Sequence, residues 1–129
     1  MMRVGFLPSD FNPMILMLGE AEDCRALADM LRRFARDGAD VPFGGLGFCR
    51  MAGADMLLTA APGPAGMHRC EGQAFLWRVP AEMAARFAER LDDLADPGRV
   101  AGSEALDCFT QDGIAVKVSR GEYTDDFMR

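Results

Sequence analysis

The sequence predicts an α+β domain in which two helices pack on one face of a mainly antiparallel sheet of about five to six strands. Three observations lead to this prediction. Two segments place apolar residues at helical spacing, a short apolar run precedes each of them, and apolar runs around turn residues follow them. The chain therefore alternates strand, helix and hairpin twice, which predicts a pseudo-repeat within a single domain that spans residues 1–129.

The first helix is expected over residues 20–37. Its apolar positions recur on one stripe and are Cys24, Leu27, Ala28, Leu31, Phe34 and Ala35. Acidic residues lie in the first turn and arginines near the last, which is the arrangement that the helix dipole favours. Gly38 follows as a C-cap, and the apolar run 14–18 before the helix predicts a buried strand.

The second helix is expected over residues 80–95. Its apolar stripe consists of Met83, Ala84, Phe87, Leu91 and Leu94. Pro80 stands near the first helical position, where a missing N–H costs nothing, and the run Asp96-Pro97-Gly98 ends the helix. The apolar run 75–79 before this helix predicts a second buried strand.

A β-hairpin is predicted near the C-terminus. Residues 105–109 and 114–119 flank the turn Gln111-Asp112-Gly113, and apolar and polar residues alternate along 114–119. This alternation is typical of a half-buried strand.

A matching hairpin is expected in the middle of the chain. Residues 46–51 and 56–59 are weaker strand candidates, and the turn segment 52–55 separates them. The Pro- and Gly-rich segment 62–66 then joins the two units, each of which is too small to be comfortably stable alone.

The composition excludes several classes of partner. The chain has 129 residues, and 20 acidic against 14 basic side chains give a net charge of −6, which disfavours nucleic acid and anionic membranes. No stretch approaches the roughly 18 to 20 apolar residues of a membrane span, and no signal peptide is recognisable, so a cytoplasmic location is expected. Lys117 is the only lysine, and the frequent Ala, Gly and Arg are typical of a GC-rich bacterial genome.

Catalytic motifs are scarce. His68 is the single histidine, so any Ser-His or Cys-His mechanism must use it, and one chain cannot form a two-histidine metal site. The sequence contains no Gly-x-Ser-x-Gly element, no Walker loop and no Rossmann fingerprint. We therefore expect a protein that is not an enzyme and that holds no cofactor.

His68 and Cys70 form the one candidate catalytic pair. In an extended segment they share a face, where an imidazole activates a thiolate or shares a metal, and Cys49 would complete a thiol-rich zinc site. The commoner explanation is an exposed loop histidine beside a buried thiol. The cysteines, which include Cys24 and Cys108, are dispersed without a Cys-x-x-Cys pair, so we expect reduced thiols that are mostly buried.

The C-terminal tail has the composition of a binding segment. It combines acidic groups with the only tyrosine and a phenylalanine, and its candidate binding residues are Glu122, Tyr123, Asp125, Asp126 and Phe127. Aromatic anchors with charges at the rim concentrate binding energy and steer partners, so the tail is expected to dock on a basic protein surface. The alternative is a tail that packs back over the sheet.

Two functions remain open. The first is a non-enzymatic protein-interaction module of bacterial type, which would be a small acidic inhibitor, an immunity-type protein or a regulatory protein. The second is a small-molecule-binding protein or enzyme with a pocket between the sheet and loop 62–66, using His68 and Cys70 or a carboxylate such as Glu104 or Asp107. Both are compatible with a homo-oligomer that pairs through an exposed strand edge.

Overall fold

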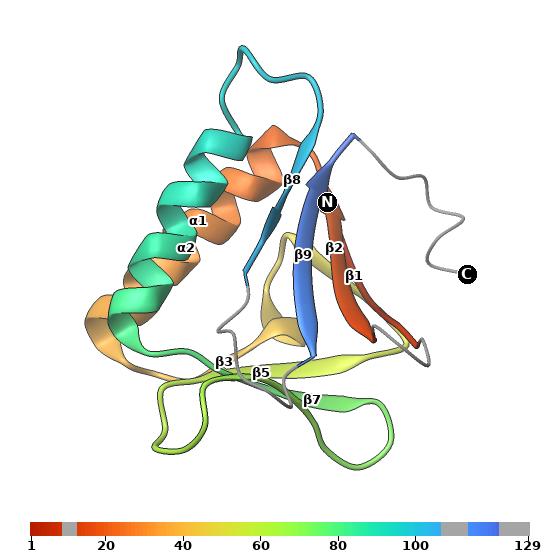
Figure 1. Ribbon diagram of the computed structural model, residues 1–129, viewed down its shortest axis with the longest axis vertical. Helices are drawn as coiled ribbons and strands as arrows, with labels where there is room; N and C mark the ends of the chain where they lie inside the picture. Colours follow the sequence, from red (N-terminus) through yellow and green to blue (C-terminus); the bar gives the residue numbers. More distant parts are fainter. Residues whose placement is uncertain (9–12, 107–113, 122–129) are drawn as a thin grey trace.

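The computed structural model describes residues 1–8, 13–106 and 114–121. In this part of the chain two helices pack against mixed sheets of five and four strands, which confirms the predicted α+β class. Figure 1 shows the two helices side by side in one layer, with the five-stranded sheet A beside them and the four-stranded sheet B across the lower end.

The two helices lie where the apolar periodicity predicts them. Helix α1 spans Ala21–Asp37 and helix α2 spans Ala81–Leu94. Glu20 and Asp23 form a capping box at the start of α1. Gly38 ends α1 in the left-handed conformation with φ 67°, and its N–H donates to the Phe34 carbonyl at 2.8 Å.

Sheet A contains strands from both ends of the chain. Its strands are β4 (Cys49–Ala52), β1 (Met2–Leu7), β2 (Met14–Gly19), β9 (Ala115–Arg120) and β8 (Gly102–Ala105), in that order across the sheet. The β1–β2 and β8–β9 pairs are antiparallel. The strand predicted over 114–119 does have an antiparallel partner, but that partner is 102–105 rather than 105–109, and the predicted turn 111–113 lies outside the described residues. The β1–β4 and β2–β9 pairs are parallel.

Sheet B is built from the middle of the chain. Its strands are β3 (Val41–Pro42), β5 (Asp55–Thr59), β7 (Ala74–Arg78) and β6 (Gly66–Arg69), in that order. The β3–β5 and β6–β7 pairs are antiparallel, while β5 and β7 run parallel. A short 3₁₀ helix, Phe43–Gly45, connects β3 with the segment that leads to β4.

The structure differs from the expected single, mainly antiparallel sheet. Strand β2, which precedes α1, runs parallel to β9 from the second half of the chain. Strand β7, which precedes α2, runs parallel to β5 from the first half. A helix that follows a strand carries the chain back along the sheet, so a later strand readily runs parallel to the first. The two halves thus complete each other's sheets.

The predicted hairpin of residues 46–51 and 56–59 is wrong. Both segments contain strands, but β4 pairs with β1 in sheet A and β5 pairs with β7 in sheet B. Gly53, at φ 71°, lies where the chain passes from one sheet to the other. The two halves differ in this respect, because β8 and β9 pair with each other whereas β4 and β5 do not, and the pseudo-repeat is not confirmed.

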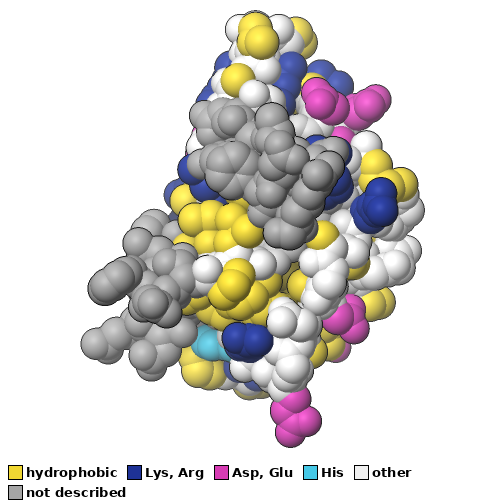
Figure 2. Space-filling model, turned by 90° about the vertical axis from the view of Figure 1, so that its right-hand side faces the viewer, with side chains coloured by type: hydrophobic (Ala, Val, Ile, Leu, Met, Phe, Trp, Pro, Cys, Tyr) yellow, Lys and Arg dark blue, Asp and Glu magenta, His cyan; other side chains and the backbone are white. Residues whose placement is uncertain are grey.

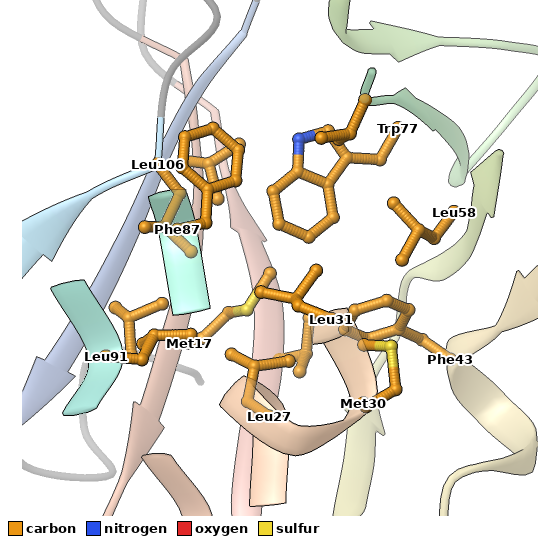
Figure 3. Packing of buried hydrophobic residues seen from close by; sticks show 14 of the residues in the cluster. Met17, Leu27, Met30, Leu31, Phe43, Leu58, Trp77, Phe87, Leu91 and Leu106 are labelled. Atoms are coloured by element: carbon orange, nitrogen blue, oxygen red, sulfur yellow. The ribbon is translucent and has the colours of Figure 1, made fainter. Parts of the chain in front are cut away.

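The core lies between the helices and the inner faces of both sheets. Figure 3 shows Trp77 from sheet B between side chains of both helices. Its ring stacks on Phe87 of α2 at a centroid distance of 5.9 Å and meets the edge of Phe43 at 6.0 Å. Trp77 is fully buried, so this aromatic group joins sheet B to the helix layer. Among the helices of the described residues, none is long and apolar enough to cross a membrane.

Candidate functional site

The face of sheet A that lies away from the helices is the most distinctive surface of the described chain. We call it the open face. Side chains alternate along a strand, so in β2 the residues Ile15 and Met17 point into the core. Leu16 and Leu18, which belong to the same strand, point to the opposite side and are absent from the core cluster.

The strand register identifies the remaining residues of the open face. Paired residues of neighbouring strands share a face of the sheet. The described outward positions are Arg50 and Ala52 of β4, Arg3, Gly5 and Leu7 of β1, Met14, Leu16 and Leu18 of β2, Ala115, Lys117 and Ser119 of β9, and Ser103 and Ala105 of β8.

The open face is basic and apolar, although the whole chain is acidic. Its described positions include Arg3, Arg50 and Lys117 and no carboxylate, while the chain carries a net charge of −6. Lys117 of β9 is paired with Leu16, and Arg3 of β1 is paired with Leu18. Cations therefore lie beside the apolar centre of the sheet. Positive charge on this face attracts acidic groups, and the leucines supply apolar contact area.

Figure 2 shows this side of the molecule. Hydrophobic side chains gather in the middle of the view, and Lys and Arg side chains lie on both sides of them. Leu16 and Leu18 themselves are buried, at 1 % and 2 % exposed.

The predicted binding residues of the tail, Glu122, Tyr123, Asp125, Asp126 and Phe127, lie outside the described residues. The described chain ends one residue after β9, at Gly121. Gly121 has φ 73°, and a Cβ at this position would lie 3.1 Å from the Val100 carbonyl oxygen, so only glycine fits here without strain.

His68 holds the Pro-rich loop in place. It lies on β6, is half-buried, and its Nε2 donates a hydrogen bond to the Pro64 carbonyl oxygen at 2.9 Å. Cys70 lies just beyond β6 and is exposed, which contradicts the expectation of a buried thiol there. Since a carbonyl oxygen only accepts, Nε2 carries the proton in this hydrogen bond, and Nδ1 is the ring nitrogen left to accept one.

A pocket lies at the predicted place beside loop 62–66, but the predicted side chains do not line it. Its volume is about 220 Å³, and its wall consists of Ala60, Ala61, Pro62, Gly63, Ala65, Arg78, Val79 and Pro80. Cys70 lines a separate groove of about 300 Å³ with residues of β5 and β7, including Asp55 and Phe75. The structure therefore places Cys70 and the loop pocket apart.

The candidate zinc ligands come from different sheets. Cys49 belongs to β4 of sheet A, whereas His68 belongs to β6 of sheet B. Across residues 1–8, 13–106 and 114–121 no three His, Cys, Asp or Glu side chains are grouped to hold a metal ion. Of the two carboxylates considered, Glu104 lies 3.6 Å from the Arg99 guanidinium, and Asp107 is outside the described residues.

Burial makes two of the thiols poor nucleophiles. Desolvation, together with the nearby Asp23 carboxylate, raises the pKa of Cys24 from 9.0 to about 11 and that of Cys49 to about 12. The thiolate is the reactive form of cysteine, and neither residue forms it near neutral pH. The thiols of Cys24, Cys49 and Cys70 are all free.

No protein family, no curated protein and no solved structure matches this chain. The function must therefore be argued from the geometry of its surfaces. The sequence contained part of the signal for the open face, since the run 14–18 is apolar at both odd and even positions. Its cations come from other strands, and only the register brings them beside the leucines.

Proposed function

We propose that this chain is a non-enzymatic protein-interaction module and that its open face binds an acidic, aromatic-containing segment of a partner protein. One observation carries the proposal, namely a cationic, apolar sheet face on a chain with a net charge of −6. Among the described outward positions, three carry a positive charge and none carries a negative one.

The chemistry of this face suits a peptide segment. Leu16 and Leu18 lie on the central strand β2, and although both are buried in the isolated chain, they form an apolar centre that an aromatic side chain would contact on binding. Arg3 and Lys117 lie on the flanking strands β1 and β9, so carboxylates on either side of that aromatic group find a cation. Apolar anchors surrounded by charges are typical of protein interfaces, where the charges direct association and the anchors supply affinity.

The thiol and histidine geometry supports a function without covalent catalysis. Nε2 of His68 is used to hold Pro64, and burial raises the pKa of Cys24 and of Cys49. The regulatory, inhibitor and immunity-type roles expected for a small bacterial protein all require binding alone. A cytoplasmic location and a homo-oligomer that pairs through a sheet edge belong to the same proposal.

Selection of binding peptides tests the proposal. A phage-displayed library of random peptides is selected against the immobilised full-length chain, and the enriched peptides are then measured individually. We expect peptides with several Asp or Glu residues around an aromatic residue, and we expect Lys117→Glu to weaken their binding about tenfold. Salt should weaken binding as well, because ionic contacts at a surface are screened.

Arg86→Glu provides the matched control for this experiment. Arg86 is exposed on α2, away from the open face, and the substitution makes the same change of charge. Binding by Arg86→Glu should stay within about twofold of the parent chain, since only long-range electrostatics change. Neutral or basic enriched peptides, or equal losses in the two variants, would overturn the proposal.

The loop pocket favours a second candidate function, a small-molecule-binding protein. The pocket of about 220 Å³ lies where the sequence predicts one, between the sheet and loop 62–66. Arg78 is the charged side chain of its wall, so the pocket would suit a small anionic molecule. Binding of a small carboxylate or phosphate that Arg78→Gln abolishes and Lys117→Glu leaves unchanged would favour this candidate over the first.

A further inference from the structure

We infer that this chain associates head to tail with copies of itself. In this contact the loop of residues 95–101 in one copy, which we call the α2–β8 loop, inserts Val100 into an apolar pocket at the end of α1 in the next copy. Neither the loop nor the pocket belongs to the open face. The inference therefore goes beyond the proposed function and does not rest on it.

Val100 is an apolar side chain in a projecting loop. It is 88 % exposed, and among the described residues Met1 is the other large apolar side chain that lies mostly exposed. Figure 1 shows the α2–β8 loop at the top of the view, beyond the ends of both helices. An isolated apolar residue on a flat surface is ordinary, but one on a projecting loop can enter a concave site and become buried there.

The α2–β8 loop is held in one conformation by its own contacts. The Asp96 carboxylate accepts a hydrogen bond from the Gly98 N–H at 2.8 Å. The Asp96 carbonyl oxygen accepts from the Arg99 N–H at 2.9 Å and from Nη1 of Arg120, on β9, at 3.0 Å. The Arg99 guanidinium also lies 3.6 Å from the Glu104 carboxylate of β8. A preformed loop of this kind loses little conformational entropy when it binds.

The pocket lies where α1 ends and β3 begins. Its volume is about 200 Å³. Met30 and Phe34 of α1 are buried, whereas Val41 and Leu46 are half-buried, so apolar walls border a space that is open to solvent. A cavity needs only about 10–15 Å³ to hold one water. The isopropyl side chain of a valine therefore fits in this pocket.

The loop and the pocket lie at opposite ends of the helix layer. Figure 1 shows the two helices antiparallel, and Arg25 near the start of α1 donates to the Ala95 carbonyl at the end of α2 at 3.2 Å. Phe34 follows Arg25 by nine residues, which is about 14 Å along the helix. The loop projects away from that end, so Val100 does not reach the pocket of its own chain. A second copy must supply the side chain.

Charges accompany the apolar contact on both of its sides. The α2–β8 loop carries Asp96 and Arg99, and the pocket carries Arg33, Asp37 and Asp40. Each side thus offers a carboxylate and a guanidinium to the other, which favours the contact and makes it sensitive to salt. Interfaces below about 1,200 Å² are typically weak, and one loop in one pocket is small. We therefore expect a dissociation constant of about 100 μM.

The contact joins two different surfaces, so it is not self-complementary. Such contacts produce open chains of molecules unless the rotation between copies closes a ring. No residue assigned to the open face takes part in the contact. A chain of copies would then present a row of open faces, and a partner with several acidic segments would bind to that row with avidity.

Two complementary variants test the inference by sedimentation velocity of the full-length chain. Val100→Asp removes the inserted side chain, and Ala39→Trp fills the pocket from an exposed position of its wall. Between about 10 and about 500 μM we expect the mean sedimentation coefficient of the parent chain to rise, while each variant alone stays a monomer. An equimolar mixture of the two variants should form dimers and nothing larger, because one variant supplies only a pocket and the other only a loop.

Ala85→Asp is the matched control for Val100→Asp. Ala85 is exposed on α2, and the substitution makes the same change of charge, so this variant should associate as the parent chain does. Circular dichroism checks that each variant is folded, and Ala39→Arg replaces Ala39→Trp if the latter does not fold.

Three results would overturn the inference. The first is a parent chain that stays monomeric at every concentration. The second is association that persists in Val100→Asp, which would assign the contact to another surface such as a sheet edge. The third is a mixture of the two variants that remains monomeric although the parent chain associates.

Discussion

Cys24 shows how the position of one side chain sets its chemistry. It lies on the buried stripe of α1, next to the buried carboxylate of Asp23. Burial and that negative charge both disfavour the thiolate, and they raise the pKa of Cys24 to about 11. The sequence predicts the burial of Cys24 from its helical spacing, but the proximity of Cys49 to the same carboxylate depends on the fold.

The pKa of Cys24 predicts how stability depends on pH. Between pH 9 and about 11 the unfolded chain loses this thiol proton while the folded chain keeps it, so the free energy of unfolding falls as pH rises. The contribution is fully present below pH 9, and its loss amounts to at most about 1.4 kcal/mol per pH unit in that interval. Urea unfolding at pH 8 and pH 10 measures this dependence.

Cys24→Ala is the informative variant for that measurement. It lowers stability at both pH values because it leaves a small cavity in the core, but it removes the titrating group. The fall in stability between pH 8 and pH 10 should therefore be smaller in Cys24→Ala than in the parent chain. Equal falls in the two proteins would show that Cys24 does not control this dependence.

His68 shows the opposite relation between sequence and structure. Its position two residues before Cys70 suggested a catalytic pair, yet its Nε2 donates to Pro64 and Cys70 faces a different groove. Spacing along a strand predicts which face two side chains share, but it does not predict which backbone carbonyl competes for the imidazole.

At the scale of elements, the C-terminus of α2 lacks the charges that normally stabilise a helix end. Its last turn contains no basic residue, whereas Asp92 and Asp93 are both acidic. Arg32 of α1 forms an ion pair with Asp92. Arg120 of β9 donates from one nitrogen to the Leu94 carbonyl at 2.9 Å and to the Asp96 carbonyl at 3.0 Å. Distant elements therefore stabilise this helix end.

Removal of Arg120 should destabilise the fold. Arg120→Ala leaves the Leu94 and Asp96 carbonyls without the charged donor that Arg120 supplies, and we expect the free energy of unfolding to fall by about 1–3 kcal/mol. Arg86→Ala, at an exposed position of the same helix, should change it by less than about 0.5 kcal/mol. Urea unfolding of both variants measures the difference, and similar values for the two would contradict this role of Arg120.

The elements that the sequence predicts well are those whose signal is local. Periodic apolar residues locate α1 and α2 within two residues of their observed ends, because each helix buries one continuous stripe. Strands β1 and β6 were not predicted, although Met2, Val4 and Phe6 of β1 alternate with Arg3 and Gly5, which is the pattern of a half-buried strand. Strand pairing is a non-local property, and for that reason the β4–β5 hairpin was wrong.

At the scale of the whole molecule, the two halves of the chain interlock. Sheet A takes β8 and β9 from the second half, and sheet B takes β3 and β5 from the first. The aromatic group around Trp77 then joins sheet B to the helices, as Figure 3 shows. The sequence predicts the α+β class from its alternating elements, but this exchange of strands depends on contacts between residues far apart in the chain.

The open face is also a property of the whole molecule. Arg3, Leu16 and Lys117 stand far apart in the sequence and become neighbours through the pairing of β2 with β1 and β9. The negative net charge of the chain and the acidic residues of its tail predicted a basic partner surface. The structure adds a basic surface within the chain itself, which composition alone does not reveal.

NMR titration of the full-length chain with an acidic, aromatic peptide obtained by selection tests the use of the open face most directly. We expect the largest changes in amide shift along β1, β2 and β9, centred on Leu16 and Lys117, and small changes in α1 and α2. Changes centred on the loop pocket at Arg78 or on the groove at Cys70, with β2 unaffected, would contradict the account.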